Sequence, residues 1–262
     1  MADAIPVFAQ PMVRVRKLEM DQPWTWLRKG WQDCLKTPGV SFGYGVLAAV
    51  TGYLVTWGLF AFDLPYLVLP LMAGFLIVGP ILAVGLYEAS RRSEHGLSTT
   101  LAEALGAFNR NPSQMGLMGI ALLLLMFFWA RTAALLFFLY FGMEPPEFHN
   151  LFVATFLSAE SWPFLIVGSA VGGVLALVAF SISIVSIPLL LDRPAANVIE
   201  AIATSLRAVQ ANPMPLLFWG GLIVVFMLAG LVTLYLGLIV TLPLVGHATW
   251  HAYRDIVVFD DV

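Results

Sequence analysis

Long stretches without any charged residue limit what this chain can fold into. Asp, Glu, Lys and Arg are all absent from residues 37–62, 64–87, 111–130, 161–191 and 208–253. Each stretch has about the 20 apolar residues that cross the hydrocarbon core of a bilayer, and the last is long enough for two crossings. Because backbone groups inside lipid must find partners within the protein, these stretches predict transmembrane helices.

The composition agrees with a membrane protein. Hydrophobic residues make up 60% of the 262 residues and charged residues only 11%, and the mean hydropathy is +0.88. A soluble domain has about 45–50% apolar and about 25% charged residues, and a folded chain of this size keeps too much surface to hide the difference. The net charge of −3 gives no reason to expect nucleic acid as a partner, and the single cysteine, Cys34, excludes an internal disulfide.

The sequence therefore predicts an all-α, polytopic integral membrane protein with about six transmembrane helices. One domain is expected at residues 24–258, after a disordered tail at 1–23 and before a short C-terminal tail at 259–262. The boundary between the last two crossings depends only on Gly230 and Gly237, and a short helix on the membrane surface is expected between Glu144 and Glu160. The predicted crossings are residues 41–61, 66–87, 115–141, 163–190, 216–231 and 233–253.

Three amphipathic segments, at about residues 24–36, 96–110 and 195–210, precede the odd-numbered crossings. In the first, Trp24, Leu27, Trp31 and Leu35 recur at helical spacing beside basic residues, which is typical of the membrane–water interface. All of the 13 Lys and Arg residues except Arg131 lie in the N-terminal segment or in residues 88–112, 192–213 and 254–262. The positive-inside rule then predicts that both termini are cytoplasmic.

A proline follows each amphipathic segment, at Pro38, Pro112 and Pro213. The residue before a proline avoids the helical region, so each of these sites predicts a corner where the chain turns into the membrane. The pattern favours a threefold repeat of one amphipathic helix plus two crossings. The even-numbered crossings also contain prolines, which are candidate kinks because proline removes a backbone hydrogen bond: Pro80, Pro188 and Pro243.

Two stretches near the C-terminus, Ala203-Thr-Ser-Leu-Arg-Ala-Val-Gln-Ala-Asn-Pro213 and Leu242-Pro-Leu-Val-Gly-His-Ala-Thr-Trp-His-Ala-Tyr-Arg254, carry a family resemblance. The chain resembles an uncharacterised bacterial family of predicted integral membrane proteins, a domain of unknown function, and the likeness is expected to extend from about residue 25 to 258. The resemblance implies a bacterial inner membrane location and no established activity.

Some members of that family are labelled cytochrome c oxidase subunit I, and the label implies association with a respiratory complex. That subunit needs many more membrane helices, and more intramembrane histidines, than a chain with four histidines offers. The sequence therefore supports at most an accessory role beside such a complex, by analogy alone.

Arg131 is the first candidate for a functional residue, because it lies about ten residues inside the third predicted crossing. Ionisable residues within a membrane are costly and often mark a functional site. Its predicted partners are Asp63 and Glu144. The alternative is structural: the side chain extends to the interface or caps backbone carbonyls of a neighbouring helix.

A second candidate is a polar cluster at the inner interface, formed by Glu88, His247 and His251. The histidines are spaced i, i+4 and share a helix face, but no Glu-x-x-His or cysteine motif accompanies them. We therefore expect hydrogen-bonded interfacial side chains rather than a metal site, and no cofactor. Glu88 is at helical spacing for an ion pair with Arg91 or Arg92.

These features favour a non-enzymatic scaffold or accessory membrane protein that binds lipids or other membrane proteins. The alternative is a transporter or channel for a small or amphipathic solute, because repeats, proline-broken helices and a buried arginine occur in that class. That alternative predicts a cavity with Arg131 on its wall. A lipid-modifying enzyme would instead need His247, His251 and Glu88 to converge.

Overall fold

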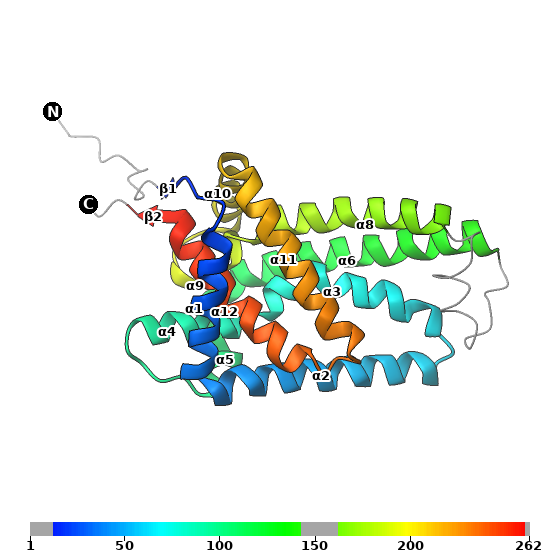
Figure 1. Cartoon of the computed structure of the whole chain (residues 1–262), viewed down its shortest axis with the longest axis horizontal. Helices are drawn as coiled ribbons and strands as arrows, with labels where there is room; N and C mark the ends of the chain where they lie inside the picture. The colour runs from blue at the N-terminus through cyan, green and yellow to red at the C-terminus, as the bar shows by residue number, and fades with distance from the viewer. Residues whose placement is uncertain (1–12, 143–161, 260–262) are drawn as a thin grey trace.

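The computed structural model describes residues 13–142 and 162–259, and these residues are almost entirely helical (Figure 1). Two short strands at the ends of the described chain, β1 (Val13–Val15) and β2 (Val257–Phe259), pair antiparallel. The helices are α1 (Gln22–Lys36), α2 (Pro38–Ala61), η1 (Pro65–Leu67), α3 (Val68–Leu82), α4 (Val84–Glu94), α5 (Leu101–Leu105), η2 (Gly106–Arg110), α6 (Pro112–Phe141), α8 (Trp162–Ser183), α9 (Ser186–Asp192), α10 (Val198–Ala211), α11 (Pro213–Val232) and α12 (Leu238–Ile256).

Five helical segments among the described residues are long and apolar enough to cross a membrane, which confirms the predicted all-α, polytopic fold. The first, third and fifth begin three residues earlier than predicted, because the corner proline itself occupies the first turn, where it sacrifices no helical hydrogen bond. The five segments are Pro38–Ala61, Pro65–Glu94, Pro112–Phe141, Trp162–Asp192 and Pro213–Val232.

The sixth predicted crossing, residues 233–253, differs from the prediction. Residues 233–237 form a turn, α12 begins only at Leu238, and its second half carries polar residues, so α12 is not among the segments that could cross by composition. Figure 1 shows that the hairpin between α11 and α12 stops short of the ends of α2 and α6 and that α12 runs back toward α1. The two glycines that predicted this boundary touch: a Cβ on Gly237 would lie 2.9 Å from the Cα of Gly230.

The three predicted corners share one backbone geometry. The residues before the prolines have nearly the same dihedral angles: φ −125° and ψ 55° at Thr37, φ −152° and ψ 66° at Asn111, and φ −133° and ψ 54° at Asn212. In each case an amphipathic helix precedes the corner and an apolar helix follows it. The three predicted corners are therefore alike in backbone, whereas the third unit lacks the second crossing that the predicted repeat requires.

The prolines inside the even-numbered predicted crossings differ in whether the helix breaks next to them. α3 ends at Leu82, two residues after Pro80, and α4 begins at Val84. The chain also breaks between α8 and α9, just before Pro188, whereas α12 continues through Pro243.

α12 is the central helix of the bundle, and glycines on its neighbours let it approach closely. A Cβ on Gly30 of α1 would lie 2.7 Å from the backbone nitrogen of Ala248, and a Cβ on Gly45 of α2 would lie 2.4 Å from the backbone oxygen of Ile239. These contacts bring backbone against backbone, as is typical of small residues between membrane helices.

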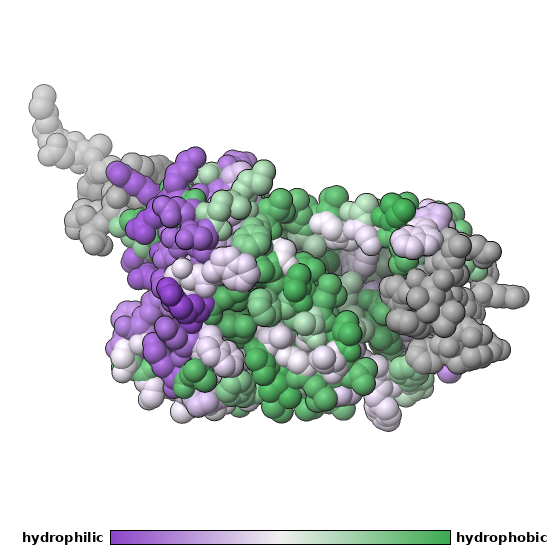
Figure 2. Space-filling view, in the orientation of Figure 1, coloured by the Kyte–Doolittle hydropathy of each residue, from purple (hydrophilic) through white to green (hydrophobic). Residues whose placement is uncertain are grey.

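The molecule has one polar end. Figure 2 shows hydrophilic residues over the end that contains α1 and the described ends of the chain, and hydrophobic residues over the helical body. We call the region of α1, α4, α5, α10 and the second half of α12 the polar end, and the opposite region, where α2 ends at Ala61 and α6 at Phe141, the far end.

One local prediction was wrong. Residues 13–23 were assigned to a disordered tail, but β1 pairs with β2 and the backbone N–H of Arg16 donates to the carbonyl of Ile256 at 2.8 Å. On α1, Trp24, Trp31 and Leu35 are exposed, whereas Trp26, Leu27, Gly30, Asp33 and Cys34 are buried against the bundle. The periodic aromatic face of this helix thus points outward. The surface helix expected between Glu144 and Glu160 lies outside the described residues, which end at Gly142 before it and resume at Trp162 after it.

Candidate functional site

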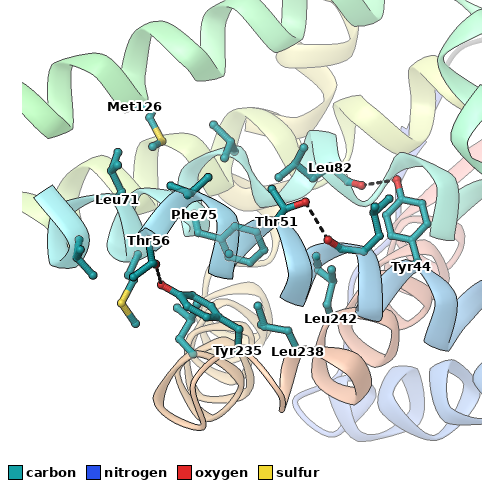
Figure 3. Close-up of a pocket in the computed structure, with 18 of the residues that line it drawn as sticks. Tyr44, Thr51, Thr56, Leu71, Phe75, Leu82, Met126, Tyr235, Leu238 and Leu242 are labelled. Carbon is teal, nitrogen blue, oxygen red and sulfur yellow. Dashed lines mark hydrogen bonds between the residues drawn. The ribbon is translucent and has the colours of Figure 1, made fainter. Parts of the chain in front are cut away.

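A narrow crevice separates α2 from α3 (Figure 3). On their other sides, both helices pack against the rest of the bundle, α2 against α12 and α3 against α6. Its volume is about 440 Å³. Helices α2 and α3 form its long walls, Leu105 and Phe108 of the α5–η2 segment border it at the polar end, and Tyr235, Leu238 and Leu242 of the α11–α12 hairpin close one side. We call this cavity the α2–α3 crevice.

The lining of the α2–α3 crevice contains no charged residue, and its polar groups are four hydroxyls. The Tyr44 hydroxyl donates to the carbonyl of Leu82 at 2.7 Å, and the Thr51 hydroxyl donates to the carbonyl of Leu47 at 2.8 Å. Leu82 is the last residue of α3, whose terminal carbonyls lack helical partners, so Tyr44 satisfies one of them. The remaining pair, Thr56 and Tyr235, has its oxygens 2.6 Å apart.

The crevice is long and thin. It extends along α2 from Tyr44 to Leu59, fifteen residues or about 22 Å at roughly 1.5 Å per residue. This elongated space and its apolar lining suit an extended hydrocarbon chain.

Tyr235 lines one side of the crevice and lies in the turn between α11 and α12, where its backbone angles are unusual. Its φ is +65°, a conformation that costs about 1–2 kcal/mol for a residue with a Cβ. The bond to Thr56 and an edge-on contact with the ring of Tyr53, with centroids 5.5 Å apart, offset this cost. Gly52 leaves room for the ring, because a Cβ there would lie 2.7 Å from Cδ1 of Tyr235.

A second feature is a buried polar network at the polar end, which we call the Asp33 network: Asp33, Ser41, Ser90, His247 and His251. The Ser90 hydroxyl donates to Asp33 at 2.8 Å, and His251 Nε2 lies 2.8 Å from the same Asp33 oxygen. His247 contacts Ser90 through Nδ1 at 2.7 Å and Ser41 through Nε2 at 2.9 Å. The network joins α1, α2, α4 and α12.

Hydrogen bonding assigns the proton positions in the Asp33 network. Ser90 has one hydroxyl hydrogen and gives it to Asp33, so Nδ1 of His247 must carry the hydrogen that Ser90 accepts. Nε2 of His247 is then an acceptor for the Ser41 hydroxyl. Burial lowers the pKa of His247 to about 4 despite the nearby Asp33, in agreement with this neutral ring.

The Asp33 carboxylate keeps its charge although it is buried. Burial raises its pKa, but the hydrogen bonds from His251 and Ser90 and the adjacent histidines have the larger combined effect, so the net pKa lies below its ordinary value. Burial raises the pKa of the neighbouring Cys34 thiol to about 12, which makes this cysteine a poor nucleophile. Asp33, Ser41, Ser90 and His247 are almost wholly excluded from solvent, so this network joins helices and offers a substrate no access.

Only part of the predicted inner-interface cluster comes together. His247 and His251 are linked through Ser90 and Asp33. Glu88 instead forms a bidentate pair with Arg91, at 2.8 and 2.9 Å, and lies 3.8 Å from Nε of Arg110. Arg91 is one of the two partners predicted from helical spacing. Among the described residues, no group of three or more His, Cys, Asp or Glu side chains could hold a metal ion.

Sequence reasoning missed Asp33, Ser41 and Ser90. One signal was available for Asp33, because it lies seven residues after Trp26 and three after Gly30, on the face that the structure buries. A carboxylate on the buried face of an amphipathic helix needs a partner. The two serines carry no comparable signal, since membrane helices use serine widely as a helix contact.

Arg131 lies on the exposed face of α6. It does not line the α2–α3 crevice, and it forms no ion pair within the described residues. It is nineteen residues after Pro112, or about 28 Å along the helix at roughly 1.5 Å per residue. If Pro112 marks one edge of a hydrocarbon core about 30 Å thick, Arg131 reaches the other edge. This position fits the structural interpretation, in which the guanidinium extends to the interface. Glu144, one predicted partner, lies outside the described residues.

Acidification should destabilise the folded protein through His247, which lies in the polar half of α12 outside the five candidate spans. Its pKa falls from the ordinary 6.5 to about 4, so between these values the unfolded chain binds more protons than the folded one. Stability is then lost as the pH falls from 6.5 toward 4, by up to about 3 kcal/mol. Asp33, with its lowered pKa, adds a loss of the same sign below its ordinary value.

Thermal unfolding of the detergent-solubilised protein at pH 8, 6.5 and 5 would test this expectation. His247→Gln is the matched variant, because glutamine can donate and accept hydrogen bonds without titrating, and it should flatten the dependence between pH 6.5 and 5. A Tm for the unmutated chain that is constant over this range would contradict the assignment of a neutral His247.

Comparisons with known proteins found a family similarity for part of the chain. Residues 68–192, from α3 to α9, match the model of a family described as "Predicted integral membrane protein (DUF2189)". No curated protein and no solved structure gave a match. The resemblance to an uncharacterised family of predicted integral membrane proteins is confirmed over these residues, a shorter range than the expected 25–258. The molecule is thus a multi-pass integral membrane protein, and the family description assigns no activity to it.

Proposed function

We propose that this protein is an accessory protein of the bacterial inner membrane that binds a lipid molecule in the α2–α3 crevice. The observation that carries the proposal is the shape and chemistry of that crevice: about 440 Å³, long, thin and lined without charge. Its volume lies within the roughly 300–1,000 Å³ of ordinary ligand sites. In a membrane, hydrocarbon chains are the available molecules that match such a lining.

The orientation of the protein in the membrane belongs to the same proposal. Every Lys and Arg except Arg131 lies in segments that the fold assigns to the polar end or next to it. The positive-inside rule then favours a cytoplasmic polar end with both termini on that side. Exposed Trp24 and Trp31 on α1 support its position at the membrane–water interface.

Transport of a small or amphipathic solute is less well supported. A path for a polar solute needs polar or charged groups along it, and the lining of the α2–α3 crevice has only four hydroxyls, each with a partner inside the protein. The transport interpretation also required Arg131 on a cavity wall, and Arg131 does not line the crevice. An enzyme using His247, His251 and Glu88 together is likewise disfavoured, because Glu88 pairs elsewhere.

Lipid bound to the purified protein would test the proposed function. We expect about one lipid molecule per chain to remain after extraction in mild detergent and extensive washing, measured by native mass spectrometry. Ala48→Phe puts an aromatic ring into the crevice and should reduce the bound lipid several-fold. Ala48 lines the crevice along the middle of α2.

Val50→Phe is the control for this experiment, because Val50 is on the same helix, is 47% exposed and does not line the crevice. It should leave the bound lipid unchanged. Equal lipid content in both variants and the unmutated chain would overturn the proposal. The same purification reports protein partners: a stoichiometric co-purifying membrane protein, such as a respiratory complex, would favour a scaffold role instead.

A further inference from the structure

We infer that the α2–α3 crevice holds one acyl chain of a diacyl aminolipid, with the ammonium head of this lipid at the far end beside Asp63 and its ester groups beside Thr56 and Tyr235. This inference rests on the proposed function and adds the direction and the headgroup class of the lipid. Three observations carry it: the closure of the crevice at the polar end, the hydroxyl pair near the far end, and the charge of the loop that joins the two walls.

The polar end of the crevice offers no place for a lipid head. Leu105 and Phe108 border it there, and the hydroxyl hydrogen of Tyr44 is already donated to the carbonyl of Leu82. A charged or strongly hydrated head placed against these residues would lose its water without gaining a partner, which costs several kcal/mol. The hydrocarbon tail therefore occupies the polar-end part of the crevice, and the head lies toward the far end.

The hydroxyl pair of Thr56 and Tyr235 retains one hydrogen-bond donor. Each hydroxyl has a single hydrogen, and their mutual bond at 2.6 Å uses only one of the two. The other hydrogen has no acceptor in the described part of the chain, and both residues line the crevice. Figure 3 shows this pair on the crevice wall, bridging α2 and the α11–α12 hairpin. An ester carbonyl of a lipid is an acceptor of the right kind.

The depth of this pair agrees with an ester group. Thr56 lies eighteen residues after Pro38, or about 27 Å along α2 at roughly 1.5 Å per residue. A hydrocarbon core is about 30 Å thick, so with Pro38 at one edge the pair lies just inside the opposite edge. Glycerol esters occupy that boundary in a bilayer, between the chains and the heads.

Asp63 supplies the charge that selects the head. It lies in the loop between Leu59 and Val68, the last lining residues of the two crevice walls, and it follows Thr56 by seven residues. Asp63 is exposed, and its carboxylate forms no ion pair or hydrogen bond within residues 13–142 and 162–259. Arg131, the other charged residue at the far end of the described chain, faces outward from α6. An ammonium head is attracted to Asp63, and an anionic head is repelled.

Competition between two lipids with identical chains would test the inference. The probes are dioleoyl phosphatidylethanolamine and dioleoyl phosphatidylglycerol, added in equal amounts to delipidated protein and counted by native mass spectrometry. We expect a preference of about two- to fivefold for the ethanolamine lipid, the range of one exposed ion pair. Asp63→Asn should remove it. Asparagine tolerates the φ of +57° at this position, so the fold should persist, and an unchanged Tm would verify this.

A second arm examines the hydroxyl pair. Thr56→Val combined with Tyr235→Phe keeps the volume of both side chains and removes both donors. It should weaken binding of the diester lipid about two- to tenfold, the effect of one hydrogen bond, and change binding of the matching diether lipid much less.

Two outcomes separate this inference from the proposed function. If Ala48→Phe abolishes lipid binding but neither headgroup preference nor Asp63→Asn sensitivity is found, the lipid site stands and the aminolipid inference fails. If Ala48→Phe leaves lipid binding unchanged, the lipid site itself fails. Equal weakening of the diester and diether lipids by the double variant would also overturn the place assigned to the ester groups.

Discussion

Gly45→Ala should strongly destabilise the protein, although alanine is the better helix former by about 1 kcal/mol. The added methyl group would lie 2.4 Å from the carbonyl oxygen and 2.6 Å from the Cα of Ile239, which are backbone atoms of the α12 region and have no rotamer to relieve the overlap. Such overpacking typically costs about 1–3 kcal/mol, and separation of α2 from the central helix adds to it. We expect Tm in detergent to fall by at least about 4–6 °C, since each kcal/mol shifts it by roughly 2–4 °C in a chain of this size.

Gly58→Ala is the matched control for Gly45→Ala. It makes the same change on the same helix, but a Cβ at Gly58 meets nothing within 4 Å. Its Tm should stay level or rise slightly, because only helix propensity changes. Equal Tm values for the two variants would show that α2 and α12 do not touch at Gly45. Differential scanning fluorimetry resolves the comparison, since the chain has eight tryptophans.

Asp33→Asn should have an effect of similar size at the polar end. The substitution keeps the shape of the side chain but removes the charge that accepts hydrogen bonds from Ser90 and His251. Each hydrogen bond to a buried charged group typically contributes about 1.5–3 kcal/mol, and Asp33 accepts two of them. A loss of about 3 kcal/mol corresponds to a fall in Tm of roughly 6–12 °C.

Glu103→Gln provides the comparison for Asp33→Asn. Glu103 is likewise a carboxylate with a side-chain partner, Arg92 at 2.9 Å, and also lies at the polar end, but its side chain is 43% exposed. Exposed ion pairs contribute little to stability, so Tm should barely change. A double-mutant cycle of Asp33→Asn with His251→Gln adds a direct test of contact: strictly additive losses would contradict the bond between these two side chains.

The helices were predictable because their signals are local. Hydropathy located the five spans to within a few residues at most ends, and the prolines at positions 38, 112 and 213 marked the corners through a backbone restriction that acts on one neighbouring residue. A helix was predicted at residues 233–253, where α12 begins five residues later, and the polar half of this helix was misread as part of a crossing. Hydropathy averaged over a window does not separate an apolar half from a polar half.

The sites were not predictable in the same way because they depend on how helices lie against each other. The α2–α3 crevice exists because α2 packs against α12, whereas α3 packs against α6 and α8. Nothing in the sequence of either helix alone indicates that the two helices diverge. Burial of Asp33 likewise depends on α12 bringing His251 to α1. Arg131 was overvalued because its depth was counted from the outer end of a long helix rather than from the corner at Pro112.

The position of α12 has a consequence for the order of events during synthesis on the ribosome. Gly30 of α1 and Gly45 of α2, near the start of the chain, both dock onto a helix that begins at Leu238. Until α12 emerges, α1 and α2 lack the surface onto which these two glycines dock, and Asp33 lacks His251 as a partner. A nascent chain that stops before residue 238 would therefore leave an apolar helix face uncovered beside a carboxylate with an incomplete set of hydrogen bonds, which is a feature that membrane quality-control proteases are suited to recognise.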